Sequence, residues 1–423
     1  IKNVQNGIHY IPDEFGQLAV PTRLNQEMKS WPMSNNILLI TTMCNCLEIF
    51  SGAGGLATGI GLAGVNHSAL VEWNADACRT LRTNYDKTLV FEGDIRSYDF
   101  SICRGVDIIA GGPPCQPFSM GGKAKGSLDE RDMFPSAIRS IRELLPRAFF
   151  FENVKGLLRP NFNSYLEYIL LQLKYPTVTN KYEDYNSHII EINRHSHNVP
   201  LHEQYDVKIQ LVNAADYGVP QKRERVIIVG IRKDLEVSWS IPPATHAYDS
   251  LLWDKYVTNA YWERHNITPT NEDYSLSTKM KDVLSMKYGF FPPESLPWQT
   301  VRDALVNIPK AGDNNFFPTE HIIREGAREY PGHTGSPIDE PAKTIKAGGH
   351  GVPGGENMIK FEDGSFRYFT IFEAKRIQTF PDSYRIVGSW TEAMRQLGNA
   401  VPVKLAQIIS SSVLSCLETG GNS

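Results

Sequence analysis

Short apolar runs alternate along the chain with segments of helical spacing. The runs are rich in β-branched and aromatic residues and occupy 46–50 (CLEIF), 68–73 (SALVEW), 89–94 (LVFEGD), 106–112 (VDIIAGG) and 148–154 (AFFFENV). Between them, 76–85 and 132–145 carry apolar side chains three and four positions apart, as amphipathic helices do. Strands that alternate with helices predict a mostly parallel α/β sheet.

The pattern changes twice further along. Two runs at 205–214 (YDVKIQLVNA) and 225–231 (RVIIVGI) are joined by the turn-rich ADYGVPQKRE, which predicts an antiparallel pair at an edge of the sheet. After Arg232 the chain is rich in Pro, His, Tyr and Trp and has little periodicity, so we predict a second domain or large insertion at 233–366. Helical periodicity returns from Arg367.

Length and composition bound the class of protein. With 423 residues, two or three structural units are expected. The chain is 41% hydrophobic and 21% charged, and no apolar run reaches the roughly 18 residues of a membrane span, which predicts a soluble globular protein. A net charge of -4 argues against a uniformly basic nucleic-acid binder but permits a local basic cleft.

Cysteine usage indicates the compartment. Six cysteines without a signal-peptide pattern predict a reducing environment, the cytoplasm, and no disulfide framework. Cys44 and Cys46 form a C-x-C pair, but a closed zinc site needs four ligands and the sequence has no second Cys/His cluster to supply them. No metal site is predicted.

A glycine-rich turn follows the first predicted strand, in LEIFSGAGGLATGIGLAG (47–64). Gly52, Gly54 and Gly55 allow a ligand to approach the backbone, and the N-terminus of the following helix favours negative charge. Packing alone is the alternative explanation for such glycines.

Three side chains that follow the next strands favour ligand binding over packing alone as the reason for this turn. Glu72 ends the second strand, about twenty residues beyond the turn, where an acidic residue of a doubly wound sheet binds ribose hydroxyls. Trp73 can cover an adenine ring, and Asp94 ends the third strand. The set suits an adenosine-containing cofactor, although the turn lacks the G-x-G-x-x-G order of a dinucleotide site.

The stretch GGPPCQPFS (111–119) places Cys115 just beyond a strand, at the carboxyl edge where open α/β sheets bind ligands. The functional hypothesis is a thiolate nucleophile, which requires exposure and a depressed pKa. The alternative is an inert buried cysteine, and this stretch alone does not separate the two. The following SMGGKAKGSLDERD (119–132) is a candidate lid over the substrate, or else a surface loop.

Two further motifs are candidates for the same edge. Glu152 in FENVKGL ends the next strand, where a carboxyl can donate a proton to a ring nitrogen; an ion-paired or helix-capping glutamate is the alternative. In QKRER, a strand would place Gln221, Arg223 and Arg225 on one face. Such a row fits phosphate or substrate contacts, and a solvated face is the alternative.

In order along the chain, six blocks resemble the DNA (cytosine-5)-methyltransferase family: FSGAGG, GGPPCQPFS, FENV, QKRERVIIVG, RYFTIFEAKRIQTFPDSY and QLGNAVPV. The resemblance runs from about residue 46 to 416, apart from about 233–340. It implies a class I S-adenosylmethionine-dependent methyltransferase fold, Rossmann-like, with helices on both faces of the sheet and a smaller target-recognition domain. It also implies S-adenosylmethionine as methyl donor and a cytosine flipped out of double-stranded DNA as acceptor.

The resemblance implies roles for individual residues. Cys115 would attack cytosine C6, and Glu152 would hold and protonate N3. Arg225 would brace the base and the carboxyl, with Arg223 nearer the phosphates. The implied cofactor residues are Phe50, Ser51, Gly52, Gly54, Gly55, Leu56, Glu72, Trp73, Asp94, Ile95, Pro114, Asn399 and Ala400.

The resemblance also implies a domain plan. We expect an extension of unknown role at 1–42, a catalytic and cofactor-binding domain at 43–232, a target-recognition domain at 233–366 and helices at 367–423 that return to close the cofactor pocket. Two positions depart from the family. Gly121 and Gly122 stand where several relatives have a side chain in the lid, and Ala400 stands where a serine is often found, which removes a hydroxyl contact to the cofactor.

The sequence argues against two other functions. Relatives that methylate transfer RNA carry a Cys-Phe-Thr motif in a shorter recognition region, whereas this sequence has no cysteine between Cys115 and Cys416. A non-catalytic DNA binder would be expected to lose Cys115 or Glu152, and both are present. A regulatory role for 1–42 stays open. We expect a monomeric cytoplasmic enzyme of bacterial or phage restriction-modification type, with duplex DNA as partner and a cognate restriction endonuclease in the same system, not necessarily in contact.

Overall fold

The computed structural model describes residues 44–114, 132–179, 184–312, 320–331, 333–347 and 355–420. The chain divides into two units, Ile1–Thr42 and Met43–Ser423, and all described residues belong to the second. The extension of unknown role at 1–42, the candidate nucleophile Cys115 and the candidate lid up to residue 131 lie outside the described residues.

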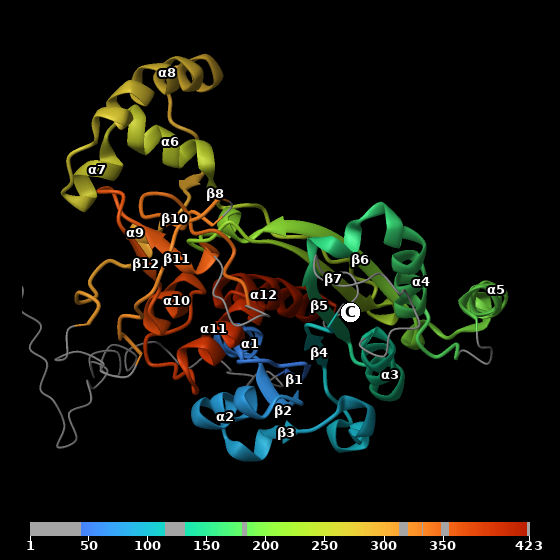
Figure 1. Cartoon of the computed structure of the whole chain (residues 1–423). Coiled ribbons are helices and arrows are strands. Elements are labelled where there is room, and N and C mark those ends of the chain that lie inside the picture. The colour runs from blue at the N-terminus through green and yellow to red at the C-terminus, as the bar shows by residue number, and fades with distance from the viewer. Residues whose placement is uncertain are drawn as a thin grey trace, which may run out of the picture. The chain divides into compact units, whose positions relative to one another are not determined.

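A seven-stranded sheet forms the centre of this unit, with strand order β3-β2-β1-β4-β5-β7-β6. Its strands are β1 Asn45–Ile49, β2 Asn66–Glu72, β3 Val90–Glu92, β4 Ile108–Gly111, β5 Ala148–Val154, β6 Tyr205–Asn213 and β7 Glu224–Arg232. Neighbouring strands are parallel except around β7, which is antiparallel to both β5 and β6. The predicted mostly parallel sheet and the antiparallel pair at its edge are both confirmed (Figure 1).

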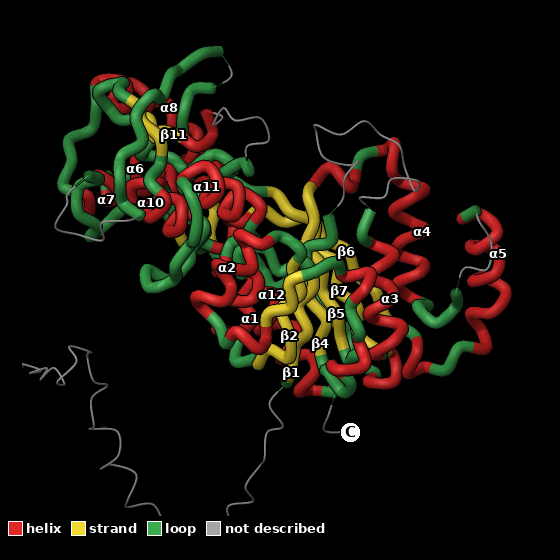
Figure 2. Tube along the Cα trace, turned by 60° about the horizontal axis from the view of Figure 1, so that its bottom comes forward, coloured by secondary structure: helices red, strands yellow, loops and turns green. Residues whose placement is uncertain are grey.

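Helices cover both faces of the sheet, because the strands are apolar on both sides (Figure 2). One face packs against α3 (Phe134–Leu144) and α4 (Asn163–Lys174), through residues such as Ile138 and Ile169. The other face packs against α1 (Gly55–Leu62) and α12 (Val403–Thr419). The remaining helices of this part are α2 (Ala75–Asn84) beside β2 and β3, and α5 (Tyr185–His195) beside α4.

Residues 233–366 contain helices that the sequence pattern did not predict. They are α6 (Tyr248–Tyr256), α7 (Ala260–His265), α8 (Asn271–Tyr288) and α9 (Val301–Ala304), with the short strands β8 (His246–Ala247), β9 (Leu296–Pro297), β10 (Ser336–Pro337), β11 (Met358–Lys360) and β12 (Phe366–Tyr368). Helices α6 and α7 share a small core of Leu251, Tyr256, Tyr261 and Trp262. A core of few, mostly aromatic residues leaves little periodic signal in the sequence. The domain bounds set from the sequence stay a prediction.

The helical pattern near the C-terminus forms α10 (Ile371–Ile377), α11 (Trp390–Asn399) and α12. Pro402 separates α11 from α12, since its ring lacks the N–H that a continuous helix needs. By length and composition alone, Trp390–Thr419 could cross a membrane. It is instead largely a core segment, 56% of its apolar window being buried, with α12 packed along α1.

The contact between α1 and α12 depends on a glycine. A Cβ added at Gly59 would collide with the Cβ of Ala406, and it would lie 2.6 Å from the backbone nitrogen of Gln407. At Gly61, on the same helix, the nearest atom would be Nε2 of His67 at 3.7 Å. The first position therefore permits close helix packing and the second does not take part in it.

We expect Gly59→Ala to lower the unfolding free energy by about 1–3 kcal/mol, the usual cost of overpacking. Gly61→Ala is the matched control and should be neutral or stabilise the protein by up to about 1 kcal/mol, because alanine favours the helix. Urea-induced unfolding of the two variants measures the difference. Equal midpoints for both would contradict the close packing.

Candidate active site

A buried ion pair lies at the carboxyl edge of β5. Nε of Arg225 lies 2.5 Å from Oε1 of Glu152, and the two side chains are only 11% and 12% exposed. The register of β5 and β7 pairs Glu152 with Ile227 and Val154 with Arg225, so the two charged side chains are diagonal neighbours on one face. Glu152 thus has the ion-paired environment that was one of the alternatives from sequence.

The two side chains that share a face with Arg225 in the motif QKRER are buried as well. Gln221 and Arg223 are 0% and 1% exposed, whereas Lys222 and Glu224 between them are exposed. The predicted alternation in QKRER is therefore present, but the solvated-face alternative is wrong. The Arg223 guanidinium donates to the carbonyls of Ile345, Gly398 and Ala400 at 3.1, 2.8 and 2.9 Å. This burial contradicts the expected position of Arg223 near DNA phosphates.

The residues leading to Cys115 are held against the end of β5. Nδ2 of Asn153 donates to the carbonyl of Pro113 at 3.1 Å. A Cβ at Gly112 would lie 3.6 Å from Oε2 of Glu152, so the bare backbone at this glycine faces the carboxylate. Pro114 is exposed, and Cys115, the next residue, lies outside the described residues.

The turn after β1 has the left-handed backbone that its glycines predict. Phe50, Gly52 and Gly54 have φ values of 57°, 53° and 81°. Among the described residues, nothing lies within 4 Å of the place where Gly52 would carry a Cβ, so this part of the structure leaves the turn open on that side. The backbone N–H of Gly52 donates to Oε2 of Glu72 at 2.8 Å, which ties the turn to the end of β2.

Glu72 organises its surroundings through both carboxylate oxygens. Its Oε1 accepts the backbone N–H groups of Trp73 and Asn74 at 3.0 and 2.8 Å. Burial raises the pKa of Glu72, while these hydrogen bonds oppose that shift. The ring of Trp73 stands 78% exposed beside this carboxylate. An exposed aromatic face next to an acceptor and an open glycine turn is an arrangement that fits an adenosine.

The other predicted cofactor residues are distributed around this turn. Ser51, Leu56 and Ile95 are buried, and Ser51 donates through its hydroxyl to the carbonyl of Glu48. The carboxylate of Asp94 is bound by the side chain and backbone of Arg96, which leaves it less available than expected. The hydrogen bond from the Arg96 side chain, followed by the one from its backbone, lowers the pKa of Asp94.

The C-terminal segment forms the opposite wall of the turn. Gly55 carries no side chain because a Cβ there would collide with the carbonyl of Val401. The hydroxyl of Tyr384 donates to the carbonyl of Ala53 at 2.6 Å. Asn399 is exposed and Ala400 is buried. Residues more than 300 positions apart thus meet at the turn.

Sequence reasoning missed several of these residues. Asn153 and Tyr384 belong to the quoted motifs FENV and FPDSY, but their backbone acceptors are set by tertiary contacts that spacing does not reveal. Glu48 is fully buried beneath the turn, and neither of its carboxylate oxygens has a hydrogen-bond partner among the described residues. Burial raises the pKa of Glu48 well above its usual range. The sequence signal that could have identified Glu48 is the presence of a glutamate inside the otherwise apolar run CLEIF.

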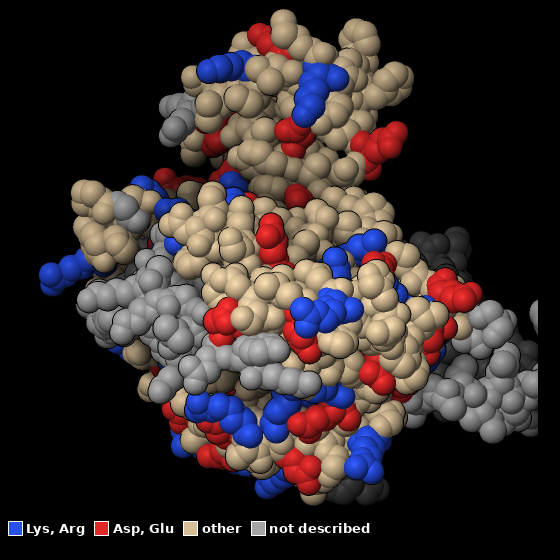
Figure 3. Space-filling view, turned by 90° about the vertical axis from the view of Figure 1, so that its right-hand side faces the viewer, with Lys and Arg blue, Asp and Glu red and all other residues tan. Residues whose placement is uncertain are grey.

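Charge is mixed on the outer surface. On the face shown in Figure 3, Lys and Arg side chains lie among Asp and Glu side chains, as expected from a net charge of -4.

Within the described ranges, no group of three or more His, Cys, Asp or Glu residues is placed to hold a metal ion. Cys44 and Cys46 are buried free thiols.

Comparisons with known proteins identify the family of this chain. The model of the C-5 cytosine-specific DNA methylases matches residues 44–194 and 199–415. The Type II methyltransferase M.Eco47II of Escherichia coli is 31% identical over 396 residues, covering 92% of this chain and 82% of the relative. The Type II methyltransferase M.NgoMIV of Neisseria gonorrhoeae is 30% identical over 383 residues, covering 88% and 97%.

Two solved structures share the fold. The Dnmt2 methyltransferase of S. pombe superposes with a TM-score of 0.51 at 17% identity, covering 90% of this chain and all of that one. The Entamoeba histolytica methyltransferase EhMeth gives 0.52 at 16% identity, covering 90% and 99%. With the family model matching most of the sequence, the chain belongs to the C-5 cytosine-specific DNA methylases, which are S-adenosylmethionine-dependent DNA (cytosine-5)-methyltransferases.

Proposed function

We propose that Glu152 and Arg225 bind the target cytosine and that Cys115 is the nucleophile that attacks its C6. The observation that carries the proposal is the buried Glu152–Arg225 pair at the carboxyl edge of β5, 2.5 Å apart, with the backbone of Gly112 facing the carboxylate. A carboxyl held by a guanidinium at a sheet edge presents its remaining oxygen in a fixed direction.

The chain connection supports a role for Cys115 at the same place. Gly112 lies beside Glu152, and three residues span at most about 11 Å even when fully extended. The Asn153 side chain holds Pro113 at the edge, which shortens the available path further. This short connection supports the proposal that Cys115 acts at the same edge of the sheet as Glu152.

The chemistry requires these residue types. A thiolate adds to C6 while Glu152 delivers a proton to N3, so the ring becomes an enamine whose C5 is nucleophilic. Bound S-adenosylmethionine supplies the methyl group that C5 takes. Loss of the C5 proton to a base, return of the N3 proton to Glu152 and return of the C6–S electron pair to Cys115 then release 5-methylcytosine and restore the thiolate and the carboxyl. Arg225 keeps Glu152 in place throughout.

For the cofactor, we propose that the turn at Phe50–Leu56 receives S-adenosylmethionine. The open side of Gly52, the exposed ring of Trp73 and the carboxylate of Glu72 support this placement. Ile95, Pro114, Asn399 and Ala400 would complete the pocket, with Asp94 in a lesser role because Arg96 occupies its carboxylate.

The biological setting is a proposal from relatives. The Type II methyltransferases among them support a role in restriction-modification, with a cognate restriction endonuclease that need not contact this enzyme. We propose that the protein acts as a monomer in the cytoplasm, on duplex DNA, with the region 233–366 recognising the target sequence.

The first prediction concerns covalent trapping. Duplex DNA in which 5-fluorocytosine replaces cytosine, together with labelled S-adenosylmethionine, should give a denaturation-resistant complex, because fluorine at C5 cannot leave as a proton does. Cys115→Ser should give none. Gel analysis of the label tests this. A variant that still forms the complex would remove Cys115 from the mechanism, and a wild-type enzyme that traps only on RNA would redirect the substrate.

The second prediction concerns Glu152. Glu152→Gln should lower kcat by about 10²-fold, since proton delivery to N3 is lost while the side-chain shape is kept. Glu224→Gln is the matched control, because Glu224 is exposed, pairs with Lys155 at 2.8 Å and precedes Arg225 on the same strand. Its kcat should stay within twofold. Single-turnover methylation measures both, and equal rates would exclude the proposed acid.

The third prediction concerns the cofactor. Trp73→Ala should weaken S-adenosylmethionine binding by about 5- to 150-fold, the loss of about 1–3 kcal/mol of base stacking. Because the ring is 78% exposed, thermal unfolding of the cofactor-free protein should be unchanged. Trp73→Phe should retain most of the affinity. Calorimetric titration with S-adenosylmethionine measures the affinity of each variant. Unchanged binding in Trp73→Ala would place the adenine elsewhere.

A further inference from the structure

One extended segment connects the helices of the region 233–366 to the active-site edge. We call residues 336–346 the strap. It begins with β10, and its Ile338 donates to the carbonyl of Lys360 in β11 at 2.9 Å. From there it passes the helices α6, α7 and α9 and then the motif QKRER.

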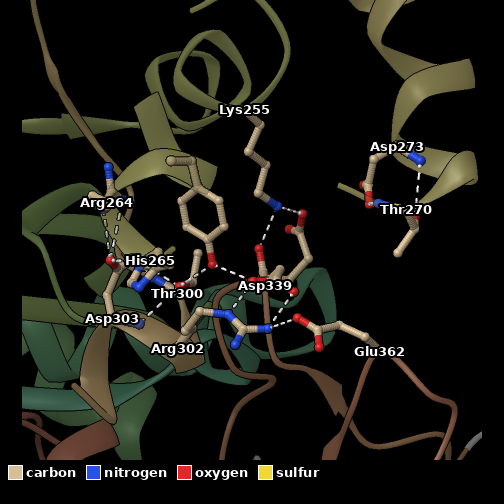
Figure 4. A network of polar contacts seen from close by, with 12 residues as sticks. Lys255, Arg264, His265, Thr270, Asp273, Thr300, Arg302, Asp303, Asp339 and Glu362 are labelled. Atoms are coloured by element: carbon tan, nitrogen blue, oxygen red, sulfur yellow. Dashed lines mark hydrogen bonds and ion pairs between the residues drawn. The ribbon is translucent and has the colours of Figure 1, made fainter. Parts of the chain in front are cut away.

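At its first end the strap is bound by side chains from several helices. The carboxylate of Asp339 accepts the hydroxyl of Tyr261 at 2.6 Å and two guanidinium bonds from Arg302 at 2.7 and 3.0 Å. Glu340 accepts from Lys255 at 2.9 Å, and Lys255 also donates to the carbonyl of Asp339. Figure 4 shows these groups converging on Asp339. These bonds connect the strap to α6, α7 and α9.

At its second end the strap pairs with the backbone before β7. The N–H of Ala342 donates to the carbonyl of Pro220 at 2.9 Å, and the N–H of Lys222 donates to the carbonyl of Ala342 at 2.8 Å. The N–H of Ile345 donates to Oε1 of Gln221 at 3.1 Å. These bonds fix the strap to the residues that immediately precede Arg223.

Arg223 joins the strap to the rest of the site. One terminal nitrogen donates to Ile345 of the strap, and the other donates to Gly398 and Ala400, on either side of Asn399. A Cβ at Gly398 would lie 2.5 Å from the carbonyl carbon of Lys346, so the end of the strap also touches this wall directly. Two residues after Arg223, Arg225 holds Glu152.

We propose that Arg223 is a positioning residue, which transmits the placement of the recognition helices through the strap to the Glu152–Arg225 pair and to the cofactor wall at 398–400. The inference rests on the function proposed above for Glu152 and Arg225. A guanidinium is suited to this role because its planar fork can hold carbonyls from two segments at once. At 1% exposure it is out of reach of a phosphate.

The first test is Arg223→Lys, which keeps the charge but cannot hold both segments in the same geometry. We expect kcat to fall by about 10- to 100-fold, the usual effect of a small misplacement of reacting groups, and the KM for S-adenosylmethionine to rise. DNA affinity should stay within twofold at every salt concentration. Arg194→Lys, on exposed α5, is the matched control and should behave as wild type.

The second test places a change at the far end of the strap. Asp339→Asn removes the negative charge to which Tyr261 and Arg302 are bound. Asp339 is not one of the residues proposed to bind DNA or cofactor, and we expect this variant also to lower kcat. Because both variants disturb one connection, the double variant should lose clearly less than the product of the two single losses. Losses that multiply would overturn the coupling.

Other outcomes overturn the inference in distinguishable ways. A weaker DNA affinity with a salt slope reduced by about one in Arg223→Gln, which removes the charge, would make Arg223 a phosphate contact. A lower melting temperature with unchanged kcat of the folded enzyme would make its role structural only. Glu152→Gln is measured in the same assay: if it is active, the proposed function fails, whereas if it is inactive and Arg223→Lys is normal, only the positioning role fails.

Discussion

The reversal of β7 between β5 and β6 is the constraint on which the site depends. In a wholly parallel sheet, the start of one strand and the end of its neighbour lie at opposite edges. Because β7 runs against β5, its first residues lie beside the last residues of β5, and Arg225 meets Glu152. The same reversal brings Arg223 to the edge where the strap and the C-terminal wall arrive.

A second constraint is the close approach of segments that are far apart in sequence. The turn after β1 is completed by the wall that includes Val401, and α12 packs along α1, because Gly55 and Gly59 carry no side chains. The cofactor pocket we propose therefore forms only when the last helices have returned to the first strand.

The sequence predicted best those elements whose local pattern of apolar residues matches their burial in the folded protein. Strand β5 is an apolar run buried on both faces, and its predicted bounds 148–154 match the structure. The helices of 248–288 were missed because their core consists of a few aromatic residues without regular spacing. Arg223 was misread because spacing shows that it shares a face with Arg225 but not that backbone carbonyls from 345, 398 and 400 surround it.

Buried charges recur where distant segments meet. Lys375, in α10, is fully buried and donates to Glu320 at 2.6 Å and to the carbonyl of Tyr384 at 2.5 Å, and Tyr384 in turn holds the turn after β1. Replacing such groups by apolar ones often preserves stability. Apolar contacts, however, do not set direction, whereas a guanidinium or ammonium surrounded by backbone carbonyls does. In this protein the buried Lys375 and Arg223 donate to backbone carbonyls of distant segments. These directional bonds fix how the segments around the site are oriented, and they offset the cost of burying the two charges.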